Sequence, residues 1–314
     1  MEVIKIHHPI NENLEFKNKC VLAMGFFDGV HLGHQKVINK AKNIADKKGL
    51  DLAILTYNHK PAVVYKQLDS HESRYLTLYN QKMSLFKNLG VNKVFLVSYT
   101  FDFQNQSPEE FVNNYLITFN VDTVVAGVDH TYGDKKANMD ILPEYANGKF
   151  NVESVDLDNL NENKISSTAI RHNLDQGDIK TVNELLGRPF RTNGMVVHGL
   201  ARGRELGYPT ANIQHDEVQW LPNIGIYVVK VFIGGKKYRG MASIGRNVTF
   251  GNKNPITVEI NILDFDHNIY GEDLSIDWLY RIRGEVKFNG INSLINQLKD
   301  DEKFTRNFFD KNNE

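Results

Sequence analysis

Two histidines that stand three residues apart, His31 and His34, follow an apolar run and begin a helical pattern. Side chains at this spacing lie on one face of the first helical turn, and a helix N-terminus attracts anions. The glycines around them let a ligand approach the backbone closely. No third metal ligand stands at a suitable spacing, so a phosphate site is favoured over a metal site. The residues expected to bind phosphate are Gly25, Phe27, Asp28, Gly29 and Gly33, with His31 and His34 stabilising the charge that grows on the phosphate during catalysis.

A second polar segment lies at residues 166–171, where two serines and a threonine precede Arg171. Hydroxyl side chains at the start of a helix are commonly caps. Arg171 lies one turn further on, where a guanidinium can hold a phosphate with two hydrogen bonds. We therefore predict that Ser167, Thr168 and Arg171 bind phosphate together with the two histidines.

A third segment, residues 199–212, alternates glycines with arginines. Its N–H and guanidinium groups can surround phosphates, although a basic glycine-rich loop is often only a solvated turn. Thr210 and Asn212 follow it, two residues apart and so on the same side of an extended chain. Their neutral oxygens suit Mg²⁺ held jointly with nucleotide phosphates. The predicted phosphate-binding residues of this loop are Gly199, Arg202, Gly203, Arg204 and Gly207.

Elements that could position the first two segments alternate between strand and helix. A helical pattern after His34 ends at Gly49, and Ser107-Pro108-Glu109-Glu110 predicts a capping box that opens another helix. Such alternation predicts a parallel sheet with helices on both faces, which binds ligands at the carboxyl ends of its strands. The expected strands are residues 19–25, 52–57, 93–98, 121–126 and 150–155, and residues 156–164 are expected to form a polar loop.

Beyond residue 187 short strands follow one another without helices. Gly234-Gly235 predicts a hairpin turn, and an amphipathic helix closes the chain. This pattern predicts a small antiparallel barrel, and with it a domain boundary that separates residues 1–186 from residues 187–314. The expected strands are residues 194–198, 226–233, 237–243, 257–265 and 274–280, and the expected core side of the last helix is Leu294, Ile295, Leu298 and Phe308.

Composition narrows the function classes. The 314 residues include 37 Lys+Arg and 38 Asp+Glu, a net charge of −1, which disfavours binding to nucleic acid or an anionic membrane through bulk charge. The single cysteine, Cys20, excludes a disulfide scaffold and indicates a reducing compartment. No apolar run approaches the ~20 residues of a membrane span, and the N-terminus lacks a signal-peptide pattern. We expect a cytoplasmic protein with small-molecule partners, no nucleic acid and no membrane; the sequence does not indicate an oligomeric state.

Together, the three segments resemble the bacterial bifunctional riboflavin kinase/FAD synthetase family. Residues 25–34 are similar to the HxGH signature of its nucleotidyltransferase superfamily, and residues 165–171 resemble the family's ISSTxIR motif. Residues 202–212 match its GRxLGYPTAN pattern, and residues 264–288 are similar to its DFD…YG…LRxExKF tail. The resemblance covers about residues 15–310 and implies a Rossmann-like nucleotidyltransferase domain followed by a riboflavin kinase barrel.

Two ATP-dependent steps are implied by this resemblance. Riboflavin would be phosphorylated to FMN, and FMN would be adenylylated to FAD with release of pyrophosphate, so ATP is a co-substrate, Mg²⁺ a cofactor and flavin both substrate and product. Glu259 would be the general base that takes the proton from the riboflavin 5′-hydroxyl; without the resemblance it is an edge-strand charge. Lys60, Asp129 and Arg283 occupy positions that the resemblance assigns to flavin contacts.

Several residues depart from the family's motifs around the flavin and ATP pockets, among them residues 135–138 and Lys164, which stands where arginine is common. Lys60 and Asn261 stand where the family has histidine, His130 lies inside its DFxFG motif, and Val248 lies inside its NxPTF motif. These departures leave two alternatives open. One is a monofunctional paralogue that keeps only the kinase or only the adenylyltransferase, and the other is a non-catalytic flavin-binding regulator.

Overall fold

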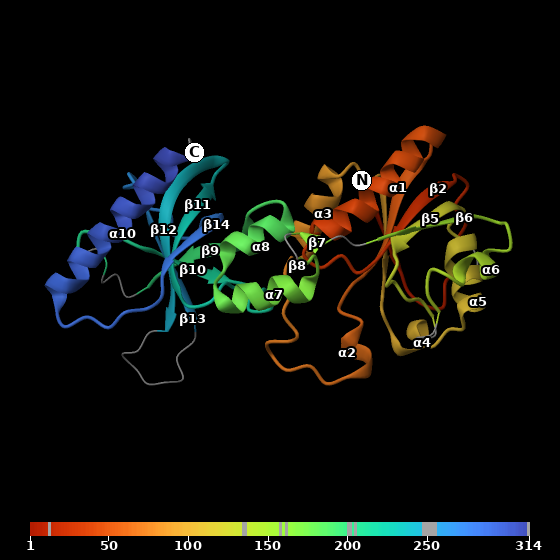
Figure 1. Ribbon diagram of the computed structural model, residues 1–314, viewed down its shortest axis with the longest axis horizontal. Helices are drawn as coiled ribbons and strands as arrows, with labels where there is room; N and C mark the ends of the chain where they lie inside the picture. The colour runs from red at the N-terminus through yellow and green to blue at the C-terminus, as the bar shows by residue number, and fades with distance from the viewer. Residues whose placement is uncertain are drawn as a thin grey trace. The chain divides into compact units, whose positions relative to one another are not determined.

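The computed structural model describes residues 1–11, 14–133, 137–156, 159–160, 163–199, 203, 206–246 and 256–312. The chain forms two compact units, Met1–Ser167 and Thr168–Glu314 (Figure 1). Packing joins the helices α7 (Ser167–Gln176) and α8 (Ile179–Leu186) to the second unit. The Asn183 side chain on α8 explains this, since it donates to the Trp278 carbonyl and accepts from the Phe190 N–H. The predicted boundary between the two domains, residues 1–186 and residues 187–314, stays a prediction.

A six-stranded parallel sheet forms the centre of the first unit, in the order β1-β4-β3-β2-β5-β6. The predicted α/β architecture is therefore confirmed. The edge strand β1 was not expected, because a sequence as mixed as EVIKI lacks the continuous apolar run of a central strand. The strands are β1 (Glu2–Ile6), β2 (Cys20–Met24), β3 (Asp51–Tyr57), β4 (Lys93–Val97), β5 (Val121–Gly127) and β6 (Asn151–Val155).

Helices cover both faces of this sheet, because alternate residues of each strand point to opposite sides. In β2, Val21 and Ala23 pack with α1 (Leu32–Lys48) and α3 (Tyr79–Asn88). Leu22 and Met24 pack on the other side. That second face is covered by α4 (Phe101–Gln104), α5 (Pro108–Phe111), the π-helix η1 (Val112–Ile117) and α6 (Leu142–Ala146), while α2 (Ala62–Tyr65) follows β3.

The helix signals are largely confirmed. Gly49 is the left-handed C-cap of α1, and Ser107 forms a capping box with Glu110 at the start of α5. The α-helix lasts only to Phe111 and then widens into η1, a form that is uncommon and that sequence periodicity does not signal. The segment at 156–164, expected to be a loop, contains two short strands, β7 (Asn159–Leu160) and β8 (Asn163–Lys164), which pair antiparallel.

A closed antiparallel barrel forms the second unit, in the order β10-β13-β12-β11-β14-β9, which confirms the predicted architecture. Gly234 and Gly235 both adopt positive φ between β11 and β12, as a tight hairpin requires. β10 was missed because its sequence, ANIQH, is mostly polar. The strands are β9 (Phe190–Val197), β10 (Ala211–His215), β11 (Gly225–Ile233), β12 (Lys236–Arg246), β13 (Ile256–Ile262) and β14 (Asp273–Arg283).

The C-terminal helix α10 (Ile291–Lys311) packs beside the barrel (Figure 1). Its buried residues are Asp301, Thr305 and Phe309. The expected core-side residues, Leu294, Ile295, Leu298 and Phe308, are partly buried, and the Phe308 ring packs against Tyr280 of β14. The fully buried Asp301 carboxylate accepts three hydrogen bonds at 2.7–3.2 Å from the Arg283 guanidinium of β14. Asp301 lies three residues after Leu298 and seven after Leu294, so a charged residue occupies the same inward face that the apolar periodicity indicates.

Replacement of Asp301 by alanine is expected to destabilise the second unit by about 3 kcal/mol, because it leaves the Arg283 charge buried without its partner. Both tryptophans, Trp220 and Trp278, lie in this unit, so fluorescence during urea unfolding reports on it. The control is Asp300→Ala, an exposed neighbour on the same helix, for which a change within about 0.5 kcal/mol is expected. Equal midpoints for the two variants would contradict the role of the ion pair.

Candidate functional sites

The turn between β2 and α1 holds three left-handed residues in a stretch of four. Phe27 has φ 56°, Gly29 has φ 87° and Val30 has φ 43°. A left-handed β-branched residue is rare and strained, which is typical of functional sites. Gly25 is required at the start of the turn, because a Cβ there would lie 2.9 Å from the Phe27 ring.

Asp28 holds this turn against a distant segment. Its carboxylate is buried, and Oδ1 accepts hydrogen bonds from the N–H groups of Leu76 at 2.9 Å and Thr77 at 3.2 Å. The next residue, Gly29, donates its N–H to the Thr77 hydroxyl at 3.0 Å. These contacts show how Asp28 fixes the predicted phosphate loop; direct phosphate contacts by the loop's residues remain a prediction.

The two predicted histidines lie together at the N-terminus of α1. His31 is the N-cap and is 2% exposed, and its Nδ1 accepts the His34 N–H at 3.3 Å. The two rings stack with centroids 3.6 Å apart, and the His34 ring packs edge-on against Phe27. Because Nδ1 of His31 accepts, the assigned neutral tautomer carries its proton on Nε2. The helix N-terminus and a donor of this kind form an anion-binding arrangement, and Gly33 lies within the same first turn.

The second predicted segment meets this turn through one residue. The Ser167 hydroxyl donates to the Asp28 carbonyl at 2.9 Å, and both residues belong to the first unit. Thr168 and Arg171 belong to the second unit, where the Arg171 guanidinium lies 5.7 Å from the Trp220 ring centroid. Their predicted contact with phosphate therefore remains a prediction.

Predicted flavin residues Lys60 and Asp129 follow β3 and β5, at the same edge of the sheet as the histidine turn. Lys60 is buried, and its Nζ donates to the carbonyls of Glu72 and Arg74, which fastens the segment before α3. Asp129 is exposed. Burial lowers the pKa of its neighbour His130 to about 4, so that this ring is neutral at pH 7. None of these contacts tests flavin binding, which stays a prediction.

Sequence reasoning missed Lys82. It lies on the inward face of α3, 6% exposed, with Nζ 3.2 Å from the carbonyl oxygen of Phe26 in the histidine turn. A signal was present, since residue 82 falls at helical spacing with Leu85, Phe86 and Leu89, and a lysine on an apolar face needs a partner.

In the barrel, cross-strand pairing brings three predicted residues together. Asn212 of β10 lies opposite Glu259 of β13, and the Thr210 hydroxyl donates to Oε2 of Glu259 at 3.2 Å. Asn261, one of the family departures, donates its side-chain amide to the Pro209 carbonyl at 2.8 Å. Two residues of β13 therefore hold the segment that leads into β10, and a carboxylate, a hydroxyl and an amide lie side by side.

The glycines of the preceding loop are needed for close packing. A Cβ on Gly199 would lie 2.0 Å from Nδ2 of Asn212, and one on Gly203 would lie 2.3 Å from the Tyr208 carbonyl. Gly207 has φ 79°, a conformation that favours glycine. Arg202, Arg204 and the departure at Val248 lie outside the described residues.

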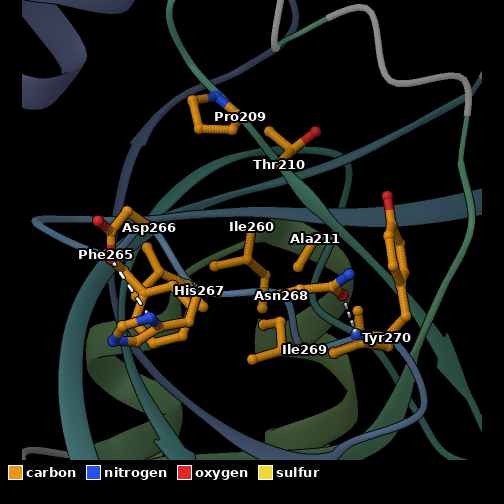
Figure 2. A pocket seen from close by; sticks show the side chains of 12 residues that line it. Pro209, Thr210, Ala211, Ile260, Phe265, Asp266, His267, Asn268, Ile269 and Tyr270 are labelled. Atoms are coloured by element: carbon orange, nitrogen blue, oxygen red, sulfur yellow. Dashed lines mark hydrogen bonds and ion pairs between the residues drawn. The ribbon is translucent and has the colours of Figure 1, made fainter.

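A cavity of about 390 Å³ opens beside Thr210. Figure 2 shows Pro209 and Thr210 at one end of it, Ile260 and Ala211 in its middle, and the segment 265–270 around the rest. Tyr270 also stacks on His198, with centroids 3.8 Å apart. A largely apolar pocket with a few polar groups at one end is typical of a small-molecule site.

Arg283, the third residue assigned to flavin by resemblance, forms the buried ion pair with Asp301 described above. Its guanidinium also lies 5.9 Å from the Phe288 ring centroid. These contacts give it a structural role, and its flavin contact stays a prediction.

The donor set at Thr210 and Asn212 fits Mg²⁺, which prefers hard oxygen ligands and shares them with substrate phosphates. Gly199 supports this fit, because its backbone lies so close to the Asn212 amide that the Asn212 side chain has little room to move. In the part of the chain that the structure describes, no group of three or more His, Cys, Asp or Glu residues could hold a metal ion.

Comparison with known proteins gives a consistent result over the whole chain. The FAD synthetase family matches residues 13–169, and the riboflavin kinase family matches residues 186–309. A protein of Listeria monocytogenes is 45% identical over 312 residues, with 99% of each chain covered, and one of Bacillus subtilis is 39% identical with 98% of each covered. Both are named bifunctional riboflavin kinase/FMN adenylyltransferase.

A solved structure has the same fold. It is from Streptococcus pneumoniae, is named a macrolide-efflux protein, and is 36% identical with a TM-score of 0.91, covering 98% of this chain and 99% of its own. Among the described residues of the present chain, no helix has the length and apolar character needed to cross a membrane. By its two family matches and its full-length relatives, the chain belongs to the bifunctional riboflavin kinase/FMN adenylyltransferase family, whose enzymes produce FMN and FAD.

Proposed function

We propose that each compact unit carries one of the two activities, the barrel phosphorylating riboflavin and the sheet unit converting FMN to FAD. The observation that supports this division is that each unit holds its own polar site. The first has stacked His31 and His34 at a helix N-terminus, and the second has Thr210, Asn212 and Glu259 beside a cavity.

In the barrel, Glu259 is the proposed general base. Its carboxylate accepts the Thr210 hydroxyl and lies opposite Asn212, so it is held at a fixed place in the site. The riboflavin 5′-hydroxyl oxygen forms a bond to the γ-phosphorus of ATP as its proton passes to Glu259. The bond between that phosphorus and the β,γ-bridging oxygen breaks, and ADP leaves. Positioning and neutralisation of charge supply most of the rate in such transfers.

Mg²⁺ would be held by the Thr210 hydroxyl and the Asn212 side-chain oxygen together with the phosphates of ATP. When bound, it neutralises negative charge on the nucleotide. Two further residues act on this pair: Gly199 leaves room for the Asn212 side chain, and Asn261 holds the Pro209 carbonyl next to Thr210.

In the sheet unit, an FMN phosphate oxygen would attack the α-phosphorus of ATP. A new P–O–P linkage forms, the bond to the β-phosphate breaks, and pyrophosphate leaves without a covalent enzyme intermediate. Nε2–H of His31, the His34 ring and the N-terminus of α1 are placed to stabilise charge on the phosphate oxygens. Ser167, whose hydroxyl donates to the Asp28 carbonyl, is proposed to complete this site, and the phosphate contacts of Thr168 and Arg171 stay predictions from the sequence.

The two-step function is tested by separating flavins after incubating the purified protein with ATP and Mg²⁺, starting once from riboflavin and once from FMN. We expect FAD from both, with FMN as an intermediate in the first. FAD from FMN alone would indicate a monofunctional adenylyltransferase, and FMN as the end product would indicate a kinase only. Binding of flavin without any product would indicate a regulator.

Glu259→Gln is expected to lower FMN formation from riboflavin by at least about 100-fold, because glutamine keeps the shape but cannot accept the proton. Conversion of FMN to FAD should remain near that of the unaltered enzyme. The control is Glu217→Gln, an exposed glutamate of the same unit, which should leave both steps unchanged. Equal loss of both steps in Glu259→Gln would refute separate sites.

His31→Asn is expected to give the converse result. Asparagine is a good N-cap and preserves the start of α1, but it removes the imidazole, so FAD formation should fall by about 100-fold or more. FMN formation should be unaffected, and His7→Asn, at an exposed histidine of the same unit, should change neither step. An unchanged rate of FAD formation in His31→Asn would remove this residue from the proposed mechanism.

A further inference from the structure

Lys82 is a buried cation to which the proposed chemistry assigns no part. Its side chain is 6% exposed on the inward face of α3, and lysine is rarely buried without a partner. Burial lowers the pKa of Lys82 to about 8, while the nearby Asp28 carboxylate acts in the opposite direction. The ammonium group therefore keeps its charge at neutral pH and must be stabilised by the groups around it.

Those groups belong to the histidine turn and to the strand beside it. Nζ of Lys82 donates to the Phe26 carbonyl at 3.2 Å and to the Thr56 hydroxyl at 3.4 Å, and it lies 4.7 Å from the Phe26 ring centroid. The Thr56 hydroxyl donates to the same Phe26 carbonyl at 2.9 Å. One carbonyl oxygen thus accepts two hydrogen bonds from buried side chains on different elements.

Holding this carbonyl fixes more than one atom. The Phe26 carbonyl and the Phe27 N–H belong to one planar, trans peptide and point in opposite directions. Anchoring the oxygen towards Lys82 and Thr56 therefore sets the direction of the Phe27 N–H. It also holds in place the peptide that leads into the left-handed Phe27, a conformation that costs about 1–2 kcal/mol for a non-glycine residue.

We propose that Lys82 is a positioning residue of the adenylyltransferase site, acting through the Phe26 carbonyl to hold the phosphate loop in its reactive geometry. This inference rests on the proposed function of the sheet unit. Lys82 contacts the loop rather than the substrate, so its contribution lies in the placement of the Phe27 N–H and, one turn later, of His31. A displacement of this loop by a fraction of an ångström would weaken donors that act on the transition state.

The decisive variant is Lys82→Met, which keeps an unbranched side chain in the buried space and removes the ammonium. The hydrogen-bond partners of Lys82 are a neutral carbonyl and a neutral hydroxyl, and burial of an ammonium is itself costly, so the urea midpoint should match that of the unaltered protein. We expect kcat for FAD formation from FMN to fall at least about tenfold, with much smaller changes in the KM values for ATP and FMN. Lys87→Met, an exposed lysine on the same helix, is the matched control and should change neither parameter.

FMN formation by the barrel of the same polypeptide provides an internal standard. An unchanged kcat for FAD formation in folded Lys82→Met would overturn the proposal, and so would an increase in KM without a loss of kcat. If the unaltered protein forms no FAD from FMN, the proposed function fails, and this role of Lys82 fails with it.

Thr56→Val provides a second test, because it removes the other hydrogen bond to the same carbonyl, together with one acceptor of Lys82, while keeping a branched side chain of similar size. It should also lower kcat for FAD formation, and the double variant should lose less than the product of the two single losses, since the carbonyl is then already released. If the loss of kcat in the double variant equals the product of the two single losses, the residues act independently, and the proposal that both act through the Phe26 carbonyl is contradicted. If Lys82→Met does not fold, Thr56→Val alone decides: an unchanged kcat overturns the proposal.

Discussion

The sheet unit depends on a strained turn that other parts of the chain hold in place. Phe27 and Val30 adopt left-handed conformations that cost each of them about 1–2 kcal/mol, so the turn between β2 and α1 would relax if it stood alone. Hydrogen bonds from separate elements prevent this. Gly25 donates to the Leu55 carbonyl of β3, and the Gln35 side chain on α1 donates to the Val30 carbonyl. These bonds join Asp28, Lys82 and Ser167 in fixing the turn, and the parallel topology makes them possible because it gathers strand ends at one edge.

In the barrel, the residues of the proposed site are held in place by the register in which the strands pair. Asn212 and Glu259 face each other because β10 and β13 pair with that alignment, and a shift of β10 by one residue would turn Asn212 to the opposite surface, away from Glu259. Closure of the barrel removes free strand edges and limits such slippage. The hydrogen bonds from Asn261 to Pro209 and from Thr210 to Glu259 then join the incoming loop to the same strand.

What the sequence could reveal follows from how local each feature is. His31 and His34 were predictable because their spacing and the preceding apolar run lie within a few residues. The pairing of Thr210 with Asn212 was predictable for the same reason. The role of Lys82 was not, because Phe26 and Thr56 are distant in sequence and the Phe26 contact is made by a backbone atom that carries no residue signature.

The same reasoning explains the errors in the predicted elements. β1 and β10 are short and mixed in polarity, so their pairing with strands far along the chain, rather than their own pattern, makes them strands. Asp301 is buried only because Arg283, on another element, neutralises it. Residue type alone assigns charged residues to the surface, and this assignment fails wherever a distant partner compensates a buried charge.

The cations Lys60, Lys82 and Arg283, two of them buried and one partly buried, also bear on how a chain with a net charge of −1 can bind polyphosphates. Lys60 is engaged by two backbone carbonyls, Lys82 by one, and Arg283 by a carboxylate, so all three positive charges stabilise the protein's own loops and helices. In the proposed adenylyltransferase site, charge on the substrate would then be met mainly by oriented donors, namely the N-terminus of α1 and the imidazoles at its first turn. Such donors are aligned before the substrate arrives, and their strength depends on geometry more than on net charge. The polar groups that fix the geometry of the turn therefore matter to the reaction as much as those that contact the phosphates.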